Sequence, residues 1–510
     1  MTIAVVITGS HWETKMVYDL LIRNANVLDG SGAPHFRADV AIQGERICAI
    51  GEMPYAKANT IIDAQEYYLA PGFIDVHTHD DTNVIRTPDM QPKLTQGVTT
   101  VVVGNCGISA SPVTLAHDVP DPMNLLGNAE DFRYPTFADY AQAVDTAQPS
   151  INVAALMGHT SLRSQVMDSF DRPANSAEIS TMEALLRQAL DEGALGLSSG
   201  LAYRNAIHAP TTEMAPLVAI VGEAGGVYTT HLRDEFAGLL DAMDEAFNTA
   251  REGKVPLVIS HLKCAGAGNW GGAVQALSKL EAATQHQHAH CDCYPYTAGS
   301  STLDLGQVTD EIEITITWSQ PHPEQARRPL KDIATEWKMP LIDAARKLQP
   351  AGAVYHNMSE ADMQQVLAHP LSMVGSDGLP NDPNPHPRLW GAFPRVLAHY
   401  SRDLNLMPLA EAVRKMTSLS AANFGLTDRG TIRIGAYADL TLFDLNTLED
   451  TANYETPIAA AKGIELVVVN GKIAYHQGAI TGQRSGRMLR RTERISHMTP
   501  SDQSKQEQTP

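Results

Sequence analysis

The chain has 510 residues, 43% of them hydrophobic, and its 58 acidic against 38 basic side chains give a formal net charge of −20. This length exceeds the roughly 250 residues that one α/β barrel needs, so we expect a large domain with additional structure around it. The acidic balance argues against nucleic acid or an anionic membrane as a partner, because both are bound through basic patches. The sequence leaves the oligomeric state open.

The N-terminal residues 1–15 are interpreted as a loose extension. Their apolar run is short and lacks a basic lead, so we expect neither an export signal nor a membrane helix. The five cysteines are odd in number and form no CxxC pair, which does not resemble an oxidised scaffold. These features favour a reducing, cytoplasmic compartment.

Two β-rich segments flank the rest of the chain. Residues 16–69 alternate apolar and polar positions between Asp-Gly, Gln-Gly and Pro-Gly turns, and residues 429–483 repeat this pattern with a hairpin signal at Asn470-Gly471. Because the two segments bracket the sequence, we expect them to pair in one small, discontinuous β-sandwich domain. The tail, residues 484–510, is poor in large apolar residues and is predicted to be disordered.

The middle of the chain, residues 70–428, repeats a strand-then-helix pattern. Helical periodicity at Ala177–Glu192 and Ala237–Arg251 separates apolar runs that end in polar residues, which predicts an α/β fold with a (β/α)8 TIM-like barrel. The interval 297–350 is too long for a βα connection and is interpreted as an inserted lid lobe. The eight candidate strands are FIDVHTH, TTVVVGNCG, INVAALMGH, ALGLSSGL, VYTTHLRDE, PLVISHLK, HCDCYPY and LSMVGSDG.

The polar residues that close these strands are candidate metal ligands, because a barrel places its active site at the C-terminal ends of its strands. A two-residue spacing on a strand directs two side chains to the same face, yet an HxH pair alone could equally be two solvated histidines. Thiolate, imidazole and carboxylate are the ligands that zinc prefers, and their joint placement predicts a zinc site with a position open for water. The candidates are His77 and His79 on the first strand, followed by Cys106, His231, His261 and Asp377.

Several motifs resemble the amidohydrolase superfamily, and within it the N-acyl-D-amino-acid deacylases, or D-aminoacylases. They include APGFIDVHTHDD, GVTTVVVGNCGIS, EGALGLSSGLAY, TTHLRDE, ISHLK and GSDGLPNDPNPHPRLWG, and the resemblance extends from about residue 18 to residue 487. Cys106 stands where many relatives bridge two metals with a carboxylated lysine. The resemblance implies a tightly held zinc ion and a second, weaker site. The tight ligands are Cys106, His231 and His261, and the weaker ones are His77 and His79.

By this resemblance the chain hydrolyses N-acyl-D-amino acids to a carboxylate and a free D-amino acid. Zinc lowers the pKa of its bound water to roughly 7, so that hydroxide attacks the amide carbonyl. Asp377 is the expected acid and base, which accepts the proton of the water and delivers it to the leaving amine. We expect an unshifted pKa of about 4 for this carboxyl group.

Four residues are candidates for binding this small-molecule substrate. Lys263 lies two residues beyond His261 and therefore faces the same mouth. Lys263, Tyr294 and Arg388 match the family positions that hold the α-carboxylate, and Tyr203 is a further candidate for contact with substrate. Plainer alternatives are a solvated rim charge for the lysine, a packed aromatic for Tyr294, a loop salt bridge for the arginine and a structural hydrogen bond for Tyr203.

The substrate side chain is predicted to be neutral or apolar. The segment after AGSSTL carries Asp304 and Gln307 rather than basic residues, and a carboxylate substrate should not be attracted to Asp304. Three further expectations concern the packing of the cysteines and the exposure of one loop. Cys291 and Cys293 should pack toward the helices, the other non-ligand cysteines should also pack, and residues 286–290 should form a solvated loop.

Two alternative functions are open. A cyclic amidase of the hydantoinase or dihydroorotase type would require a bridging lysine at the second or fourth strand, and neither VVVGNCG nor LGLSSGL contains one. A barrel that serves only as a binding scaffold should have lost metal ligands, whereas this chain keeps them all. Both alternatives are therefore less favoured than a zinc-dependent deacylase.

Overall fold

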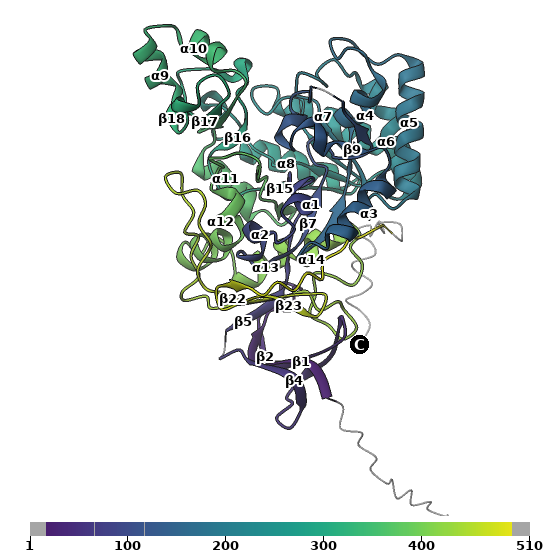
Figure 1. Ribbon diagram of the computed structural model, residues 1–510, viewed down its shortest axis with the longest axis vertical. Helices are drawn as coiled ribbons and strands as arrows, with labels where there is room; N and C mark the ends of the chain where they lie inside the picture. Colours follow the sequence, from purple (N-terminus) through teal and green to yellow (C-terminus); the bar gives the residue numbers. More distant parts are fainter. Residues whose placement is uncertain (1–16, 66, 117, 492–510) are drawn as a thin grey trace, which may run out of the picture.

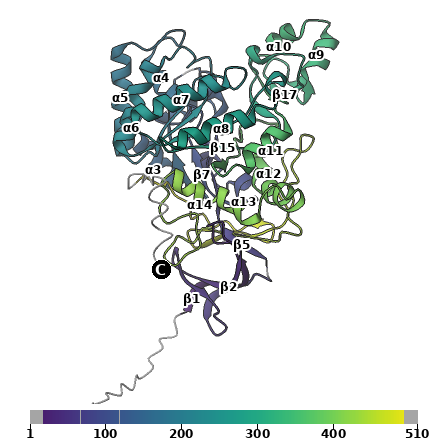
Figure 2. The ribbon, with the colours of Figure 1, turned by 180° about the vertical axis from the view of Figure 1, so that it is seen from behind.

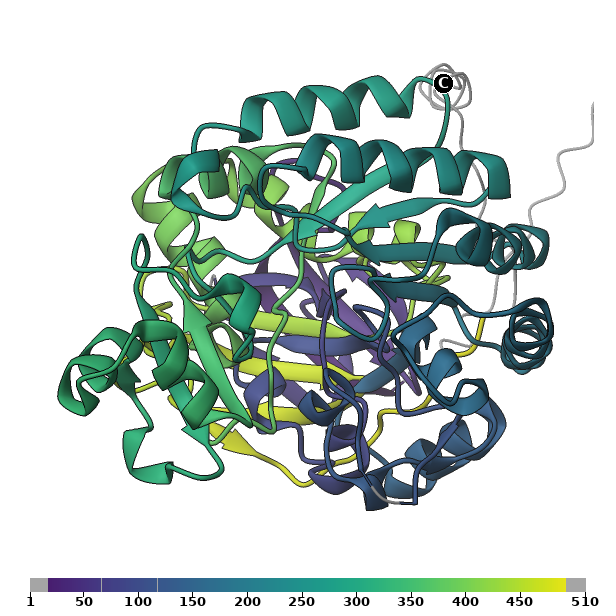
Figure 3. The ribbon, with the colours of Figure 1, turned by 90° about the horizontal axis from the view of Figure 1, so that it is seen from above.

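The computed structural model describes residues 17–65, 67–116 and 118–491. Its centre is a barrel of parallel strands with helices around it (Figure 3). Each of the eight apolar runs contains a strand of this barrel, so the predicted (β/α)8 fold is confirmed. The strands are β6 (Phe73–Asp75), β7 (Val98–Val103), β10 and β11 (Asn152–Ala155 and Met157–Gly158), β12 (Gly196–Gly200), β13 (Val227–His231), β14 (Leu257–Ile259), β15 (Ala289–Cys293) and β20 (Ser372–Val374).

The barrel strands pair in two parallel ladders, β10-β7-β6 and β11-β12-β13-β14-β15-β20. The third strand links the ladders, since β10 and β11 are separated only by Leu156. The eighth and first strands, by contrast, meet at a seam. There the described pairing is reduced to an isolated bridge between Thr78 and Gly378 and a 2.8 Å hydrogen bond from the Asp377 N–H to the His77 carbonyl.

The helices pack their apolar faces on the barrel. In α5 (Ser176–Asp191), the Asn175 side chain accepts hydrogen bonds from the first turn, and Glu178 completes the capping box that starts the helix. The predicted Ala177–Glu192 and Ala237–Arg251 helices match α5 and α7 within two residues. Further helices are α3 (Phe137–Ala147), α4 (His159–Val166), α6 (Thr211–Ala224), α7 (Leu239–Gly253), α8 (Ala273–Thr284), α11 (Glu360–Ala368), α12 (Arg388–Arg395), α13 (Leu409–Met416) and α14 (Ser418–Asn423).

Both ends of the chain contribute to one sheet of nine strands at one end of the molecule (Figures 1 and 2). The N-terminal β5 pairs antiparallel with the C-terminal β21, and the two groups of strands share one apolar core. The domain boundaries at residues 69/70 and 428/429 stay a prediction. The strands are β1 (Val17–Val27), β2 (Phe36–Gln43), β3 (Arg46–Gly51), β4 (Lys57–Asp63), β5 (Tyr68–Pro71), β21 (Leu440–Phe443), β22 (Ile464–Val469), β23 (Lys472–His476) and β24 (Ala479–Ile480).

The inserted lobe forms a small sheet with its own core and lies at the opposite end from the nine-stranded sheet (Figure 1). Its last strand, β19, pairs with both β16 and β17, so the lobe ends at Tyr355 rather than at residue 350. Its elements are β16 (Gly299–Thr302), β17 (Ile314–Ser319), β18 (Arg328–Pro329), α9 (Leu330–Trp337), α10 (Leu341–Leu348) and β19 (Ala351–Tyr355).

Two expectations at the chain's periphery need correction. Disorder was expected from residue 484, yet residues 484–491 lie against the barrel, where Met488 is buried and forms a bridge with Val153. The segment 286–290 is not a solvated loop over its whole length. His290 belongs to β15, and burial lowers the pKa of this histidine to about 3. The expected N-terminal extension and the remainder of the tail lie outside the described residues. Every described helix is too short or too polar to cross a membrane.

Phe73 links the barrel to the nine-stranded sheet. Its ring stacks on Phe393 of α12 at 5.9 Å between centroids and lies 6.4 Å from Phe443 of β21. We predict that Phe73→Ala lowers the free energy of unfolding by about 3–5 kcal/mol, because it leaves a cavity between these rings. Urea unfolding followed by tryptophan fluorescence measures this change. Tyr55→Ala, at a side chain that is 94% exposed, is the control, and equal midpoints for the two variants would contradict the assignment.

Candidate metal centre

The structure brings together the six candidate ligands that the sequence predicts. The imidazole of His261 lies 4.9 Å from that of His77 and 4.5 Å from that of His231, measured between ring centroids. Three overlapping sets of donor atoms each lie within 4.8 Å of one another. The sets are His77, Cys106 and His261; His77, His79 and Asp377; and His231, Glu235 and His261.

The backbone is turned sharply at three of these residues. Cys106, His261 and Asp377 have φ values of 54°, 36° and 50°, in the left-handed region that non-glycine residues rarely adopt. All three follow the ends of barrel strands, where the turn directs each side chain into the mouth. Such backbone strain is typical of functional sites, because the surrounding fold must hold the residue in a costly conformation.

Cys106 is at the centre of the cluster. Its sulfur lies 3.1 Å from His77 Nε2 and 3.4 Å from His261 Nε2, and the residue is only 1% exposed. Burial alone would raise the pKa of this thiol, but the charges of His77 and His261 and hydrogen bonds from His231 and His261 hold it well below its usual value. These neighbours therefore favour the thiolate, the form of cysteine that binds metals.

Two carboxylates orient the imidazoles. Asp292 lies 3.2 Å from His77 Nδ1, and Glu235 lies 3.0 Å from His261 Nδ1, which leaves both Nε2 atoms directed at the cysteine sulfur. Carboxylates in this position fix the orientation of metal-binding histidines. Neither carboxylate was predicted. The signals available in the sequence were the position of Asp292 two residues before Tyr294 on the same strand and that of Glu235 four residues after His231.

Asp377 is held between imidazoles and a guanidinium. Its Oδ1 lies 3.1 Å from His79 Nε2 and 3.6 Å from His77 Nε2, and its Oδ2 lies 2.8 Å from Arg388 Nη1. Burial would raise the pKa of Asp377, but Arg388 and the histidines lower it well below its usual value. The expectation of an unshifted pKa near 4 was therefore wrong, because the sequence did not show that Arg388 contacts this carboxylate.

The four candidate substrate-binding residues surround the same cluster. Lys263 is buried and its Nζ lies 2.9 Å from His261 Nδ1 and 2.5 Å from Glu235 Oε1, so it is not a solvated rim charge. Arg388 is fully buried with its guanidinium 4.5 Å from the centre of the Tyr294 ring, and the Tyr203 ring lies 4.8 Å from that of His231.

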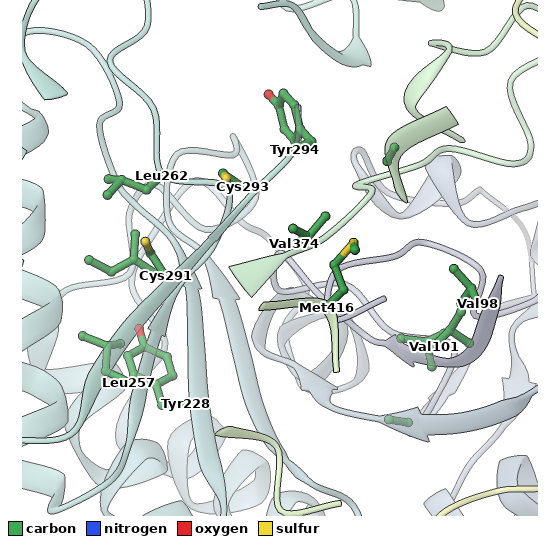
Figure 4. Packing of buried hydrophobic residues seen from close by; sticks show 14 of the residues in the cluster. Val98, Val101, Tyr228, Leu257, Leu262, Cys291, Cys293, Tyr294, Val374 and Met416 are labelled. Carbon is green, nitrogen blue, oxygen red and sulfur yellow. The ribbon is translucent and has the colours of Figure 1, made fainter. Parts of the chain in front are cut away.

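The remaining cysteines of the barrel belong to its packing. Cys291 and Cys293 lie among apolar side chains of the core (Figure 4), and burial raises the pKa of both thiols. The expectation that they pack is confirmed. Cys106 thus differs from them in having imidazoles rather than apolar neighbours.

The donor set fits a metal ion. One thiolate, several imidazoles and one carboxylate match the chemistry of zinc sites. Two buried nitrogens of the cluster, His79 Nδ1 and His231 Nδ1, have no hydrogen-bond partner among the described residues. Buried polar atoms are normally satisfied, so each of these two imidazoles has a nitrogen left for a further partner.

The chain is similar to known proteins over most of its length. Residues 60–475 match the amidohydrolase family. A D-aminoacylase of Alcaligenes xylosoxydans xylosoxydans is 46% identical, over 93% of this chain and 98% of that protein. An N-acyl-D-aspartate deacylase of the same organism is 43% identical over 92% and 95%. The structure of an N-acyl-D-glutamate deacylase from Bordetella bronchiseptica with zinc and a phosphonate inhibitor superposes with a TM-score of 0.90 at 41% identity, covering 93% of this chain and 100% of that one.

The thiolate of Cys106 can be tested through metal content. We predict that Cys106→Ala loses most of the metal that the purified protein retains after dialysis, because the variant lacks the only charged sulfur ligand that we assign. Cys293→Ala, which removes a buried thiol on the packing side of β15, should retain it. Elemental analysis of both variants decides the matter, and full metal occupancy in Cys106→Ala would contradict the assignment.

Proposed function

The chain belongs to the amidohydrolase family, in its D-aminoacylase branch, and we propose that it hydrolyses N-acyl-D-amino acids to a carboxylate and a free D-amino acid. The observation that carries this proposal is the Cys106 sulfur among imidazoles, 3.1 Å from His77 Nε2, with Asp377 ion-paired to Arg388 at the edge of the cluster. Relatives named for this activity extend over nearly the whole chain, which supports the same reaction.

The metal is proposed to be zinc. Cys106, His231 and His261 are the proposed tight ligands, and His77 and His79 the ligands of a second, weaker site. The soft thiolate and the imidazoles favour zinc over magnesium or calcium, which prefer oxygen ligands. When bound, zinc supplies an activated water and polarises the amide carbonyl.

Asp377 is the proposed catalytic acid and base. Its low pKa keeps it ionised at neutral pH, so it can accept the proton of the attacking water. Arg388 contacts Oδ2, while Oδ1 faces His79 at 3.1 Å, so the carboxylate is fixed with one oxygen toward the metal ligands. The same oxygen then delivers the proton to the amine, which must be protonated before the C–N bond breaks.

The α-carboxylate of the substrate is proposed to bind Arg388, Lys263 and Tyr294, with Tyr203 as a further contact. Arg388 is fully buried, and its Nε has no hydrogen-bond partner among the described residues. A guanidinium presents five N–H donors in a planar fork, and an unpaired buried donor is costly. This orphan donor supports the presence of an anionic group of the substrate beside Arg388.

The activity is tested with paired enantiomers. We predict that metal-replete protein releases methionine from N-acetyl-D-methionine at least tenfold faster than from the L-enantiomer. Asp377→Asn should lower kcat by about 10²–10⁴-fold, because the amide cannot accept the proton. Asp168→Asn, at a side chain that is 86% exposed, is the matched control. Equal rates for the enantiomers, or an unimpaired Asp377→Asn, would refute the corresponding claim.

The preferred side chain of the substrate is proposed to be neutral or apolar. Asp304 starts a short helical turn, where it accepts a 2.8 Å hydrogen bond from the Gly306 N–H. Asp121 lies near it, and the charge of Asp304 adds to the effect of burial in raising the pKa of Asp121. The carbonyl of Asp121 is held by Asn205, two residues from Tyr203, which supports a position of this acidic pair near the mouth. A carboxylate side chain would be repelled there.

This preference is measured as a ratio of kcat/KM values. The kcat/KM for N-acetyl-D-methionine should exceed that for N-acetyl-D-glutamate. Asp304→Asn should lower this ratio, because asparagine still caps the turn but carries no charge. Gln307→Glu should raise the ratio. A higher kcat/KM for the D-glutamate derivative with the wild-type protein would show that the proposed preference is wrong.

A further inference from the structure

The proposed metal ligands His77 and His79 and the proposed acid and base Asp377 lie on opposite sides of the seam between the eighth and first barrel strands. His77 and His79 follow β6, and Asp377 follows β20, yet the two strands are not joined by a regular ladder. The spacing between them is therefore not set by repeated backbone hydrogen bonds, as it is between the other barrel strands. Close packing helps to set this spacing. A Cβ atom added to Gly375 would lie 2.4 Å from the Cβ of His77, so the two chains approach too closely for a side chain at residue 375.

A buried lysine bridges this seam. Lys93, in the short helix α2 (Gln91–Leu94), is fully buried, and its Nζ contacts oxygens from both strands. It lies 2.8 Å from Asp75 Oδ2, 3.1 Å from Asp80 Oδ2 and 2.9 Å from Ser376 Oγ. Asp75 and Ser376 thus accept hydrogen bonds from the ammonium group, and the Asp80 carboxylate forms a second ion pair with it.

The acceptors of Lys93 hold the residues next to the reacting groups. Asp75 Oδ1 accepts a 2.8 Å hydrogen bond from the Ser376 N–H and a 3.4 Å one from the His77 N–H. Ser376 Oγ accepts one from the Gly378 N–H at 3.2 Å. The backbone on both sides of Asp377 is therefore tied to the strand that carries the histidines, and Lys93 fixes both partners.

We propose that Lys93 is a positioning residue of the reaction: through Asp75 and Ser376 it sets the distance between the His77–His79 pair and Asp377. This inference rests on the proposed function for the role of Asp377. The lysine touches neither the proposed ligands nor the substrate-binding residues. Its effect follows from geometry, since a displacement of about 1 Å between reacting groups can cost 10²-fold in rate.

Two variants remove the bridge at different points. Ser376→Ala deletes the hydroxyl at the strand-eight end and leaves the ion pairs of Lys93 intact, and we expect it to lower kcat by about tenfold. Lys93→Met deletes the whole bridge, and we expect a loss of about 100-fold. KM for N-acetyl-D-methionine should stay within about twofold in both. The double variant should be no slower than Lys93→Met, because both substitutions break one connection.

The matched control is Lys415→Met. Lys415 is also fully buried and donates to backbone carbonyls of His369 and Ser372, at the start of β20 and therefore at the opposite end of this strand from Asp377. It should lower the thermal midpoint while leaving kcat unchanged. An equal loss of kcat in Lys415→Met would show that any buried lysine has this effect and would overturn the proposal. If Lys93→Met does not fold, Ser376→Ala decides.

A second measurement does not depend on turnover. The visible absorption spectrum of the Co²⁺-loaded protein reports the arrangement of the ligands, and we expect its bands to shift in Ser376→Ala and Lys93→Met but not in Lys415→Met. If the wild-type protein hydrolyses no N-acyl-D-amino acid, the proposed function is refuted. The Co²⁺ spectra would still report whether Lys93 and Ser376 position the ligands. A folded Ser376→Ala with wild-type kcat and an unchanged Co²⁺ spectrum would overturn the positioning role.

Discussion

The contact of the Cys106 sulfur with the imidazoles of His77 and His261 is the interaction on which the rest of the site depends. A thiol buried this deeply would stay protonated among apolar neighbours, as Cys291 and Cys293 do. The charges of His77 and His261, whose Nε2 atoms lie 3.1 and 3.4 Å from the sulfur, oppose that preference and lower the pKa of the thiol. The barrel fold must also hold Cys106 in a strained backbone conformation, since its φ lies in the left-handed region.

The charges around this centre are arranged in pairs. Asp292 and Glu235 orient two imidazoles, and Arg388 neutralises Asp377 on the side away from the histidines. Burying an unpaired charge is expensive, so each carboxylate keeps the next group in place and in one ionisation state. Catalytic geometry and stability are therefore coupled here, and a change at one member is expected to be felt by the others.

Much of this architecture could be predicted from the sequence, because a barrel strand has a simple signature of an apolar run closed by polar residues. The period of two along a strand also placed His77 and His79 on one face. The ion pair of Asp377 with Arg388 was not predictable, because it depends on how the loop after β20 folds back. Nor was the role of Lys93, since a lysine in a short helix looks solvated until three distant acceptors are seen around it.

The proposed reaction requires one metal ion per chain, bound by the Cys106 thiolate. This requirement is tested most directly by titrating Co²⁺ into metal-free protein while following both the thiolate-to-cobalt absorption and the release of D-methionine from its N-acetyl derivative. Both signals should rise together and saturate at about one ion per chain, because Cys106 is the assigned sulfur ligand of the tight site. Activity that develops without the sulfur-to-cobalt band, or a band that saturates without activity, would show that the Cys106-bound metal ion does not support the reaction.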